Sequence, residues 1–155
     1  MTKAAVVHIH ICPKAEQPMV AVHEVRAEPG RGLEGDRYAE HAGTYSDTPG
    51  SGRQVTLVAS EALEQAEREQ GVRLAPGESR RNITTRGVDL NALVEREFRV
   101  GDVVLRGTRL CEPCEYLQGL TGQDGLLKAL VHRGGLRCDI VRGGTIHVGD
   151  EISVA

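Results

Sequence analysis

The sequence predicts a mainly β domain with a few short helices (α+β), folded into a closed or nearly closed β-barrel. Short runs of alternating apolar and polar residues recur at frequent intervals along the 155 residues, which is typical of barrels. Two late stretches, residues 98–105 and 146–153, each place Gly-Asp between two such runs, and this pattern predicts a tight hairpin. The expected helices are too few and too brief for a repeated βαβ fold.

The first strands are expected at residues 4–11 and 19–26, joined by a turn near Pro13. His8 and His10 lie two positions apart on the first of these strands, so both side chains belong to one face and have the spacing of a metal chelate. Two exposed histidines on the polar face of a strand are the expected explanation.

A glycine-rich loop follows at residues 29–38, where the backbone can approach a ligand closely. Gly30, Gly32 and Gly35 have the spacing of a dinucleotide fingerprint, but no helix is predicted after them, as such a site requires. The polar segment at residues 39–53 is long for a loop in a compact domain. It is expected to be either a mobile lid or a tolerated insertion.

The middle of the chain predicts a strand at residues 54–58 and a covering helix that starts at Ser60 and stops at Gly71. Its apolar stripe is expected to pack on the domain, and no chemistry is assigned to it. A second short helix is predicted at residues 125–132, and a strand with Leu136, Cys138 and Ile140 on one face follows it.

Arg80, Arg81 and Asn82 form a polar cluster after a Pro-Gly turn. Arginine suits phosphate and other anions, and an asparagine amide can both donate to and accept from a heterocycle. From the residues alone, a solvated loop whose charges are balanced by Glu78 and Asp89 is favoured over an anion site.

Cys111 and Cys114 flank Pro113 at a predicted strand-to-helix junction, where a helix N-terminus favours the thiolate. Spacing alone leaves three readings: a redox dithiol, a metal site and inert core thiols. A structural zinc site needs four ligands, which His132 and Cys138 would have to complete, but Cys138 fits a buried strand face. A thioredoxin-like dithiol belongs in a βαβ context, so the expected β-barrel makes the redox interpretation weaker.

Composition narrows the class of protein. The net charge of −3 gives no basic field for nucleic acid, and no apolar run approaches the length of a membrane span. The irregularly spaced cysteines and the lack of an apolar signal segment indicate a cytoplasmic protein with reduced thiols. With one Phe and no Trp, the core must be aliphatic, and 155 residues predict a single domain at residues 1–155.

With these segments placed, the sequence resembles the MOSC domain, named after the C-terminal domain of molybdenum cofactor sulfurases. The resemblance lies in segments whose order and spacing match the family and which cover nearly the whole chain, as in its stand-alone bacterial form. They are residues 32–37 (Gly-Leu-Glu-Gly-Asp-Arg), 79–83 (Ser-Arg-Arg-Asn-Ile), 98–105, 111–114 (Cys-Glu-Pro-Cys) and 133–150.

The resemblance implies a MOSC-type β-barrel that binds the pterin-based molybdenum cofactor. Cys114 matches the family's cysteine, which is a ligand to molybdenum or a carrier of sulfane sulfur. Arg80 and Asn82 match an Arg-x-Asn-Ile segment that contacts the cofactor, and the loop residues expected to contribute to the site are Gly35, Asp36 and Arg37.

The implied activity is reduction of N-hydroxylated small molecules, such as amidoximes, hydroxylamines and N-hydroxylated bases, at a Cys114-ligated molybdenum centre. Because no flavin or iron–sulfur motif is present, the expected partner is an electron-donor reductase. A second hypothesis is a carrier that holds sulfur as a persulfide, or the cofactor itself, for a biosynthetic or acceptor protein. A third is a dithiol redox protein that uses Cys111 and Cys114.

Pyridoxal phosphate is not expected as a cofactor. The chain has only three lysines, Lys3, Lys14 and Lys128, and none lies in a convincing Schiff-base context.

Overall fold

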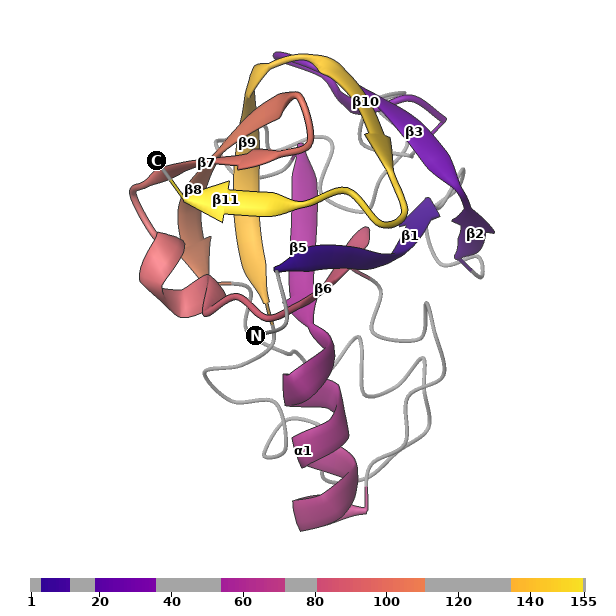
Figure 1. Ribbon diagram of the computed structural model, residues 1–155, viewed down its shortest axis with the longest axis vertical. Helices are drawn as coiled ribbons and strands as arrows, with labels where there is room; N and C mark the ends of the chain where they lie inside the picture. The colour runs from indigo at the N-terminus through magenta and orange to yellow at the C-terminus, as the bar shows by residue number, and fades with distance from the viewer. Residues whose placement is uncertain (1–3, 12–18, 36–53, 72–80, 111–134, 155) are drawn as a thin grey trace, which may run out of the picture.

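The computed structural model describes residues 4–11, 19–35, 54–71, 81–110 and 135–154, and it is mainly β (Figure 1). The described helices are α1 (Ser60–Gln70) and the 3-10 helix η1 (Leu90–Leu93). The strands are β1 (Ala5–Ile11), β2 (Val20–Val22), β3 (Glu24–Glu28), β4 (Gly32–Leu33), β5 (Val55–Ala59), β6 (Ile83–Arg86), β7 (Glu97–Val100), β8 (Val103–Leu110), β9 (Leu136–Arg142), β10 (Gly144–His147) and β11 (Ile152–Val154).

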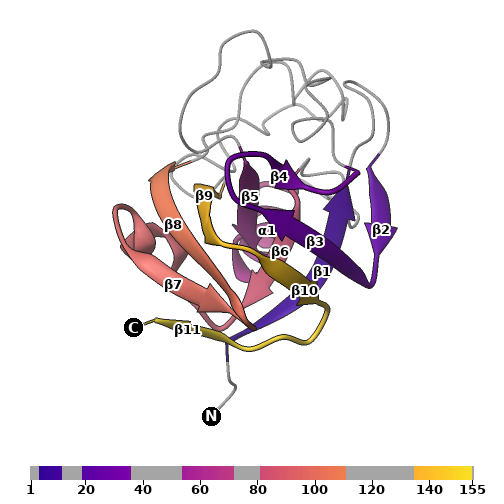
Figure 2. The ribbon, with the colours of Figure 1, turned by 90° about the horizontal axis from the view of Figure 1, so that it is seen from above.

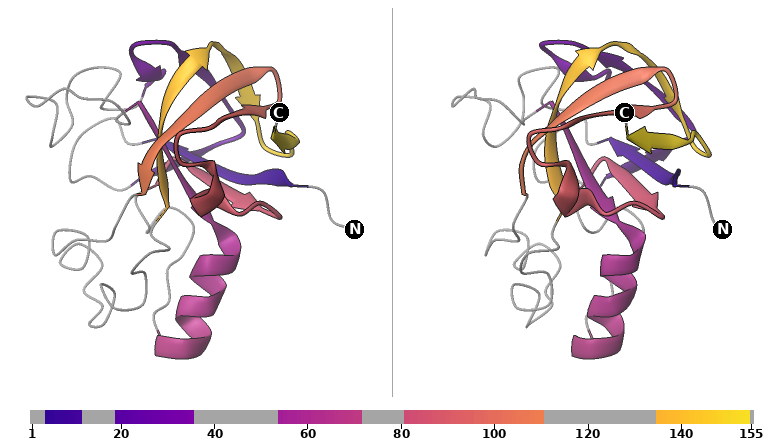
Figure 3. Two further views of the ribbon diagram at one scale, coloured as in Figure 1. Left: turned by 90° about the vertical axis from the view of Figure 1, so that its left-hand side faces the viewer. Right: turned by 60° about the vertical axis from the view of Figure 1, so that its left-hand side comes forward.

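The strands form an eight-stranded sheet in the order β11-β7-β8-β9-β5-β6-β1-β2 and a three-stranded sheet in the order β10-β3-β4. Neighbouring strands are antiparallel except β5 and β6, which are parallel and are connected through α1. A parallel pair needs such a crossover, because its strands cannot be joined by a tight turn. α1 extends away from the strands on the side opposite β3 and β10 (Figures 1 and 3).

The start of β11, at one edge of the large sheet, lies beside the start of β1 (Figure 2). The chain entering β11 hydrogen-bonds to β1, where Val6 N donates to Asp150 O at 3.0 Å and Ile152 N donates to Ala4 O at 2.8 Å. The other edge strand of this sheet is β2, however, and no sheet of the described residues closes on itself. The mainly β prediction is therefore confirmed, and the closed barrel is not.

The core is aliphatic, as the composition predicts. One row of side chains crosses three strands inside the large sheet: Leu57 on β5, Ile83 on β6 and Ile9 on β1, each register partner of the next. All three are at most 1% exposed, and burying each stabilises the fold by roughly 1.5–3 kcal/mol. We call these residues the core row.

One of the two predicted Gly-Asp hairpins forms. β7 and β8 pair with Val100 opposite Val103, so Gly101 and Asp102 make the two-residue turn. The prediction for residues 146–153 is wrong, because β10 pairs with β3 and β11 pairs with β7. Long-range partners therefore replaced the local pairing, and the chain crosses from one sheet to the other at this turn.

The boundaries of two predicted elements also differ. Residues 19–26 do not form one strand, because the chain breaks at His23 into β2 and β3. α1 ends as predicted, with Gly71 in the left-handed region at φ 68°, but Ser60 is its first residue rather than its cap. The predicted helix at 125–132 and the segment at 39–53 lie outside the described residues.

Neither described helix has the length and apolarity needed to cross a lipid bilayer.

Candidate functional site

Asn82 is a predicted site residue that the structure describes, and it lies at the start of β6. Asn82 directly precedes Ile83, so its side chain points to the face opposite the core row. Thr56 on β5 and His10 on β1 flank it on the same face, as the neighbouring register pairs and their hydrogen bonds with Asn82 place them. We call Thr56, Asn82 and His10 the polar row.

Asn82 joins the strands on both sides of it. Its Oδ1 accepts hydrogen bonds from Thr56 N at 3.1 Å and from Thr56 Oγ1 at 3.2 Å, and its backbone N donates to Thr56 Oγ1 at 3.1 Å. Its Nδ2 donates to His10 O at 3.1 Å, and His10 N donates to Asn82 O at 2.6 Å. Both lone pairs of Oδ1 are therefore used within the protein.

Asn82 is only 4% exposed. For this residue the expectation of a solvated loop is wrong. The contact with a cofactor that the family resemblance implies for Asn82 stays a prediction.

His10 is the exception to the expectation of two exposed histidines. It is 3% exposed, while His8 faces solvent, with a ring centroid 6.0 Å from that of His10. Burial lowers the pKa of His10, and the neighbouring His8 lowers this pKa further. The ring nitrogen Nδ1 is buried and has no hydrogen-bond partner among the residues that the structure describes. Such an atom needs an explanation, because an unpaired buried polar group is costly.

Arg81 and Gly135 bring the ends of two predicted site segments together. Arg81 directly follows the segment that ends in Arg80, and Gly135 directly follows the segment that contains the cysteines. A Cβ built on Gly135 would lie 3.4 Å from Arg81 Nε and would clash with the carbonyl oxygen of Leu57. Gly135 also has φ +122°, so both its backbone conformation and this close approach require glycine.

The glycine-rich loop packs against its own chain. Gly32, at φ +132°, would place a Cβ 2.8 Å from the carbonyl oxygen of Gln54, and Gly35 would place one 3.1 Å from Ile11 Cδ1. Gln54 Oε1 accepts from Gly30 N at 3.3 Å and from Ile140 N at 2.9 Å. The close approach that Gly32 permits is thus to the protein itself. A role for Gly35 in binding a ligand remains a prediction.

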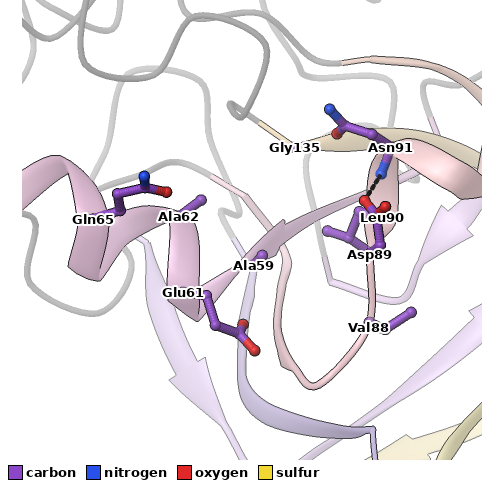
Figure 4. A pocket seen from close by; sticks show the side chains of 9 residues that line it. All are labelled: Ala59, Glu61, Ala62, Gln65, Val88, Asp89, Leu90, Asn91 and Gly135. Carbon is purple, nitrogen blue, oxygen red and sulfur yellow. Dashed lines mark hydrogen bonds between the residues drawn. The ribbon is translucent and has the colours of Figure 1, made fainter.

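A pocket of about 180 Å³ lies between α1 and the turn into η1, with Gly135 in its wall (Figure 4). Two acids line it: Glu61, whose Oε2 accepts from Gly87 N at 2.7 Å, and Asp89, whose Oδ1 accepts from Asn91 N at 3.2 Å. Ligand pockets usually enclose about 300–1,000 Å³. Its size and its carboxylates make this pocket a poor fit for a phosphorylated pterin.

Several predicted site residues lie outside the described residues: Cys114 with Cys111, Arg80, Asp36 and Arg37. Within the described part of the chain, no group of three or more His, Cys, Asp or Glu side chains could hold a metal ion. Cys138 is fully buried in β9 with Leu136, as predicted. The described residues fit the non-metal part of the cofactor, since they offer the arginine Arg81 and the unpartnered nitrogen of His10.

Sequence reasoning missed three residues that organise this region: Thr56, Gln54 and Gly135. Thr56 lies in a short apolar strand, where a threonine is unremarkable by itself. Gly135 lies directly before a buried strand, and a glycine in that place is a signal for close backbone approach.

The chain matches the model of the MOSC domain over residues 39–153, and it belongs to the MOSC family. That family is associated with binding of the molybdenum cofactor. No curated protein is significantly similar in sequence.

The fold is also that of several solved structures. The YUAD protein from Bacillus subtilis superposes with a TM-score of 0.77 at 21% identity, covering 97% of this chain and 94% of that protein. YiiM from Geobacillus stearothermophilus gives 0.73 at 16% identity, with 98% and 75% covered. YiiM from Escherichia coli gives 0.71 at 16% identity, with 100% and 70% covered. At these identities the likeness shows the fold.

Proposed function

We propose that this protein binds the molybdenum cofactor and reduces N-hydroxylated small molecules, with Cys114 as the protein ligand to molybdenum. The observation that supports this most is the family match, whose residues 39–153 include Cys114 and Arg80. A thiolate is a soft ligand suited to such a metal, and an arginine suits the phosphate of the cofactor.

The described residues support binding in three ways. The bonds of Asn82 to Thr56 and His10 fix the point at which the chain enters β6, directly after Arg80 and Arg81. Gly135 fixes the point at which the cysteine-bearing segment enters β9, next to Arg81. The buried Nδ1 of His10 offers a hydrogen bond on the same face as Asn82.

The bound cofactor would supply two-electron redox chemistry at its metal. Two electrons and two protons cleave the N–O bond of a hydroxylamine or amidoxime, and the products are the corresponding amine or amidine and water. The electrons would come from a separate reductase.

Two measurements test the proposal. Protein purified from a host that makes the cofactor is analysed for molybdenum and pterin, and it is then assayed with a chemically reduced viologen as electron donor. The substrates are an amidoxime, a hydroxylamine and an N-hydroxylated base. Retained cofactor with turnover of at least one substrate is expected. Retained cofactor without turnover would favour the carrier, and a protein that never retains cofactor would contradict both of these hypotheses.

The cysteine pair offers a matched control. Cys114→Ser is expected to abolish molybdenum retention, because a hydroxyl is a much poorer ligand than a thiolate for a soft metal. Cys111→Ser keeps the rest of the segment and should retain most of the metal. Equal loss in both variants would indicate a dithiol and would refute a single ligand at Cys114.

A further inference from the structure

Two arginines lie opposite each other on β8 and β9. Arg109 is the register partner of Arg137, and like charges opposite each other on adjacent strands destabilise a sheet. Within the described part of the chain, neither side chain forms an ion pair. Elsewhere on the same two strands, Arg106 lies opposite Asp139 and Arg142 lies opposite Val104, so among the described pairs of β8 and β9 two like charges face each other only at Arg109 and Arg137.

This arginine pair continues directly into the polar row. Arg137 is the register partner of Thr56, which bonds Asn82, which in turn bonds His10. Register partners point to the same face, so the pair and the polar row form one line across β8, β9, β5, β6 and β1, opposite the core row. With about 4.8 Å between strands, the line from β9 to β1 is roughly 14 Å long.

Exposure changes along this line. Arg109 is exposed and Arg137 is half-buried, whereas Asn82 and His10 are buried at 4% and 3% exposure. At the buried end lies the unpartnered Nδ1 of His10. The line therefore has an accessible cationic end and an occluded end with an unused hydrogen-bonding atom.

We propose that Arg109 and Arg137 bind the phosphate group of an anionic ligand whose polar ring system lies along the polar row and hydrogen-bonds to His10 Nδ1. A phosphate between the two guanidinium groups would cancel their repulsion and accept charge-assisted hydrogen bonds from both. The ligand class is a phosphorylated heterocycle. Its identity as the molybdenum cofactor rests on the proposed function, but the anion site does not.

Inorganic pyrophosphate is the probe for the cationic end. It is titrated into the cofactor-free full chain at low ionic strength, and the affinity is measured by calorimetry. Arg109→Gln and Arg137→Gln are each expected to weaken binding about tenfold or more, as loss of a charge-assisted contact does. Arg106→Gln, on the same strand and face but opposite a carboxylate, is the control, with a change of less than about twofold expected.

The proposal is overturned if both variants bind pyrophosphate like the wild type, or if Arg106→Gln weakens binding as much as they do. Thermal unfolding of each variant confirms that it is folded.

Cofactor retention separates this inference from the proposed function. If the wild type retains molybdenum and pterin and the Arg109 and Arg137 variants retain as much, the inference fails and the function stands. If no cofactor is retained but pyrophosphate binds through the arginine pair, the function fails and the anion site stands. His10→Phe keeps a ring without nitrogen and should reduce retention while leaving pyrophosphate affinity unchanged. Undiminished retention in that variant would refute the orientation along the polar row.

Discussion

Replacing Thr56 by valine tests the strand-joining role of Asn82. Valine keeps the shape of threonine but removes the hydroxyl that donates to Asn82 Oδ1 at 3.2 Å and accepts from Asn82 N at 3.1 Å. The N–H of Asn82 then loses its bond to Thr56 Oγ1 in a residue that is 4% exposed, so water cannot readily replace the lost partner. An unsatisfied buried donor costs about 1–3 kcal/mol, and the lost hydroxyl bond about 1 kcal/mol more.

The expected loss for Thr56→Val is therefore about 3 kcal/mol of unfolding free energy. For a domain of this size that corresponds to a fall in Tm of roughly 6–12 °C. Urea denaturation measures the free energy, and calorimetry measures the Tm. Thr145→Val on β10 is the matched control, because Thr145 is also half-buried and its hydroxyl forms no hydrogen bond within the described residues. A loss for Thr56→Val no larger than that for Thr145→Val would refute the reasoning.

Two further predictions concern Gly135 and His10. Gly135→Ala should cost roughly 3 kcal/mol or more, since it combines a positive φ with a clash against the carbonyl of Leu57, while Gly71→Ala, at positive φ but in open space, should cost only about 1–2 kcal/mol. Equal costs in urea denaturation would exclude the close approach. Burial, and then His8, lowers the pKa of folded His10, so the unfolded chain binds this proton more readily. Stability should accordingly fall as the pH drops below about 6.5 towards the folded pKa, and His10→Phe should flatten this part of a Tm–pH curve; an unchanged slope would contradict it.

Regular alternation made the core strands predictable. Leu136, Cys138 and Ile140 alternate with polar residues, and all three are buried on one face of β9 as expected. The turn at Gly101 and Asp102 was predictable for a similar reason, because the two strands that flank it in the sequence, β7 and β8, pair with each other. The same Gly-Asp pattern recurs before Ile152, but there the two flanking strands pair with distant strands, β10 with β3 and β11 with β7. A local sequence pattern contains no information about such distant pairing.

The candidate site was predictable in its residue types but not in its burial. His10 and Asn82 are polar and are therefore expected to face solvent, because nothing in a strand pattern shows whether its outer face will be covered. Thr56 lies 26 residues before Asn82, and its partnership with Asn82 depends on the parallel pairing of β5 with β6. That pairing is set by the crossover through α1, so only the three-dimensional structure shows it.

Strand geometry explains why the Arg-x-Asn-Ile segment of the family has an asparagine at position 82. Ile83 fills the core row, and Asn82 must therefore point to the opposite face, between Thr56 and His10. There it needs an oxygen that accepts twice and a nitrogen that donates to the carbonyl of His10. Aspartate would supply the oxygen but bury a charge and leave that carbonyl without its donor, and leucine would supply neither. An asparagine is thus required at this position by the joining of three strands, and its bonds fix the point at which the chain enters β6.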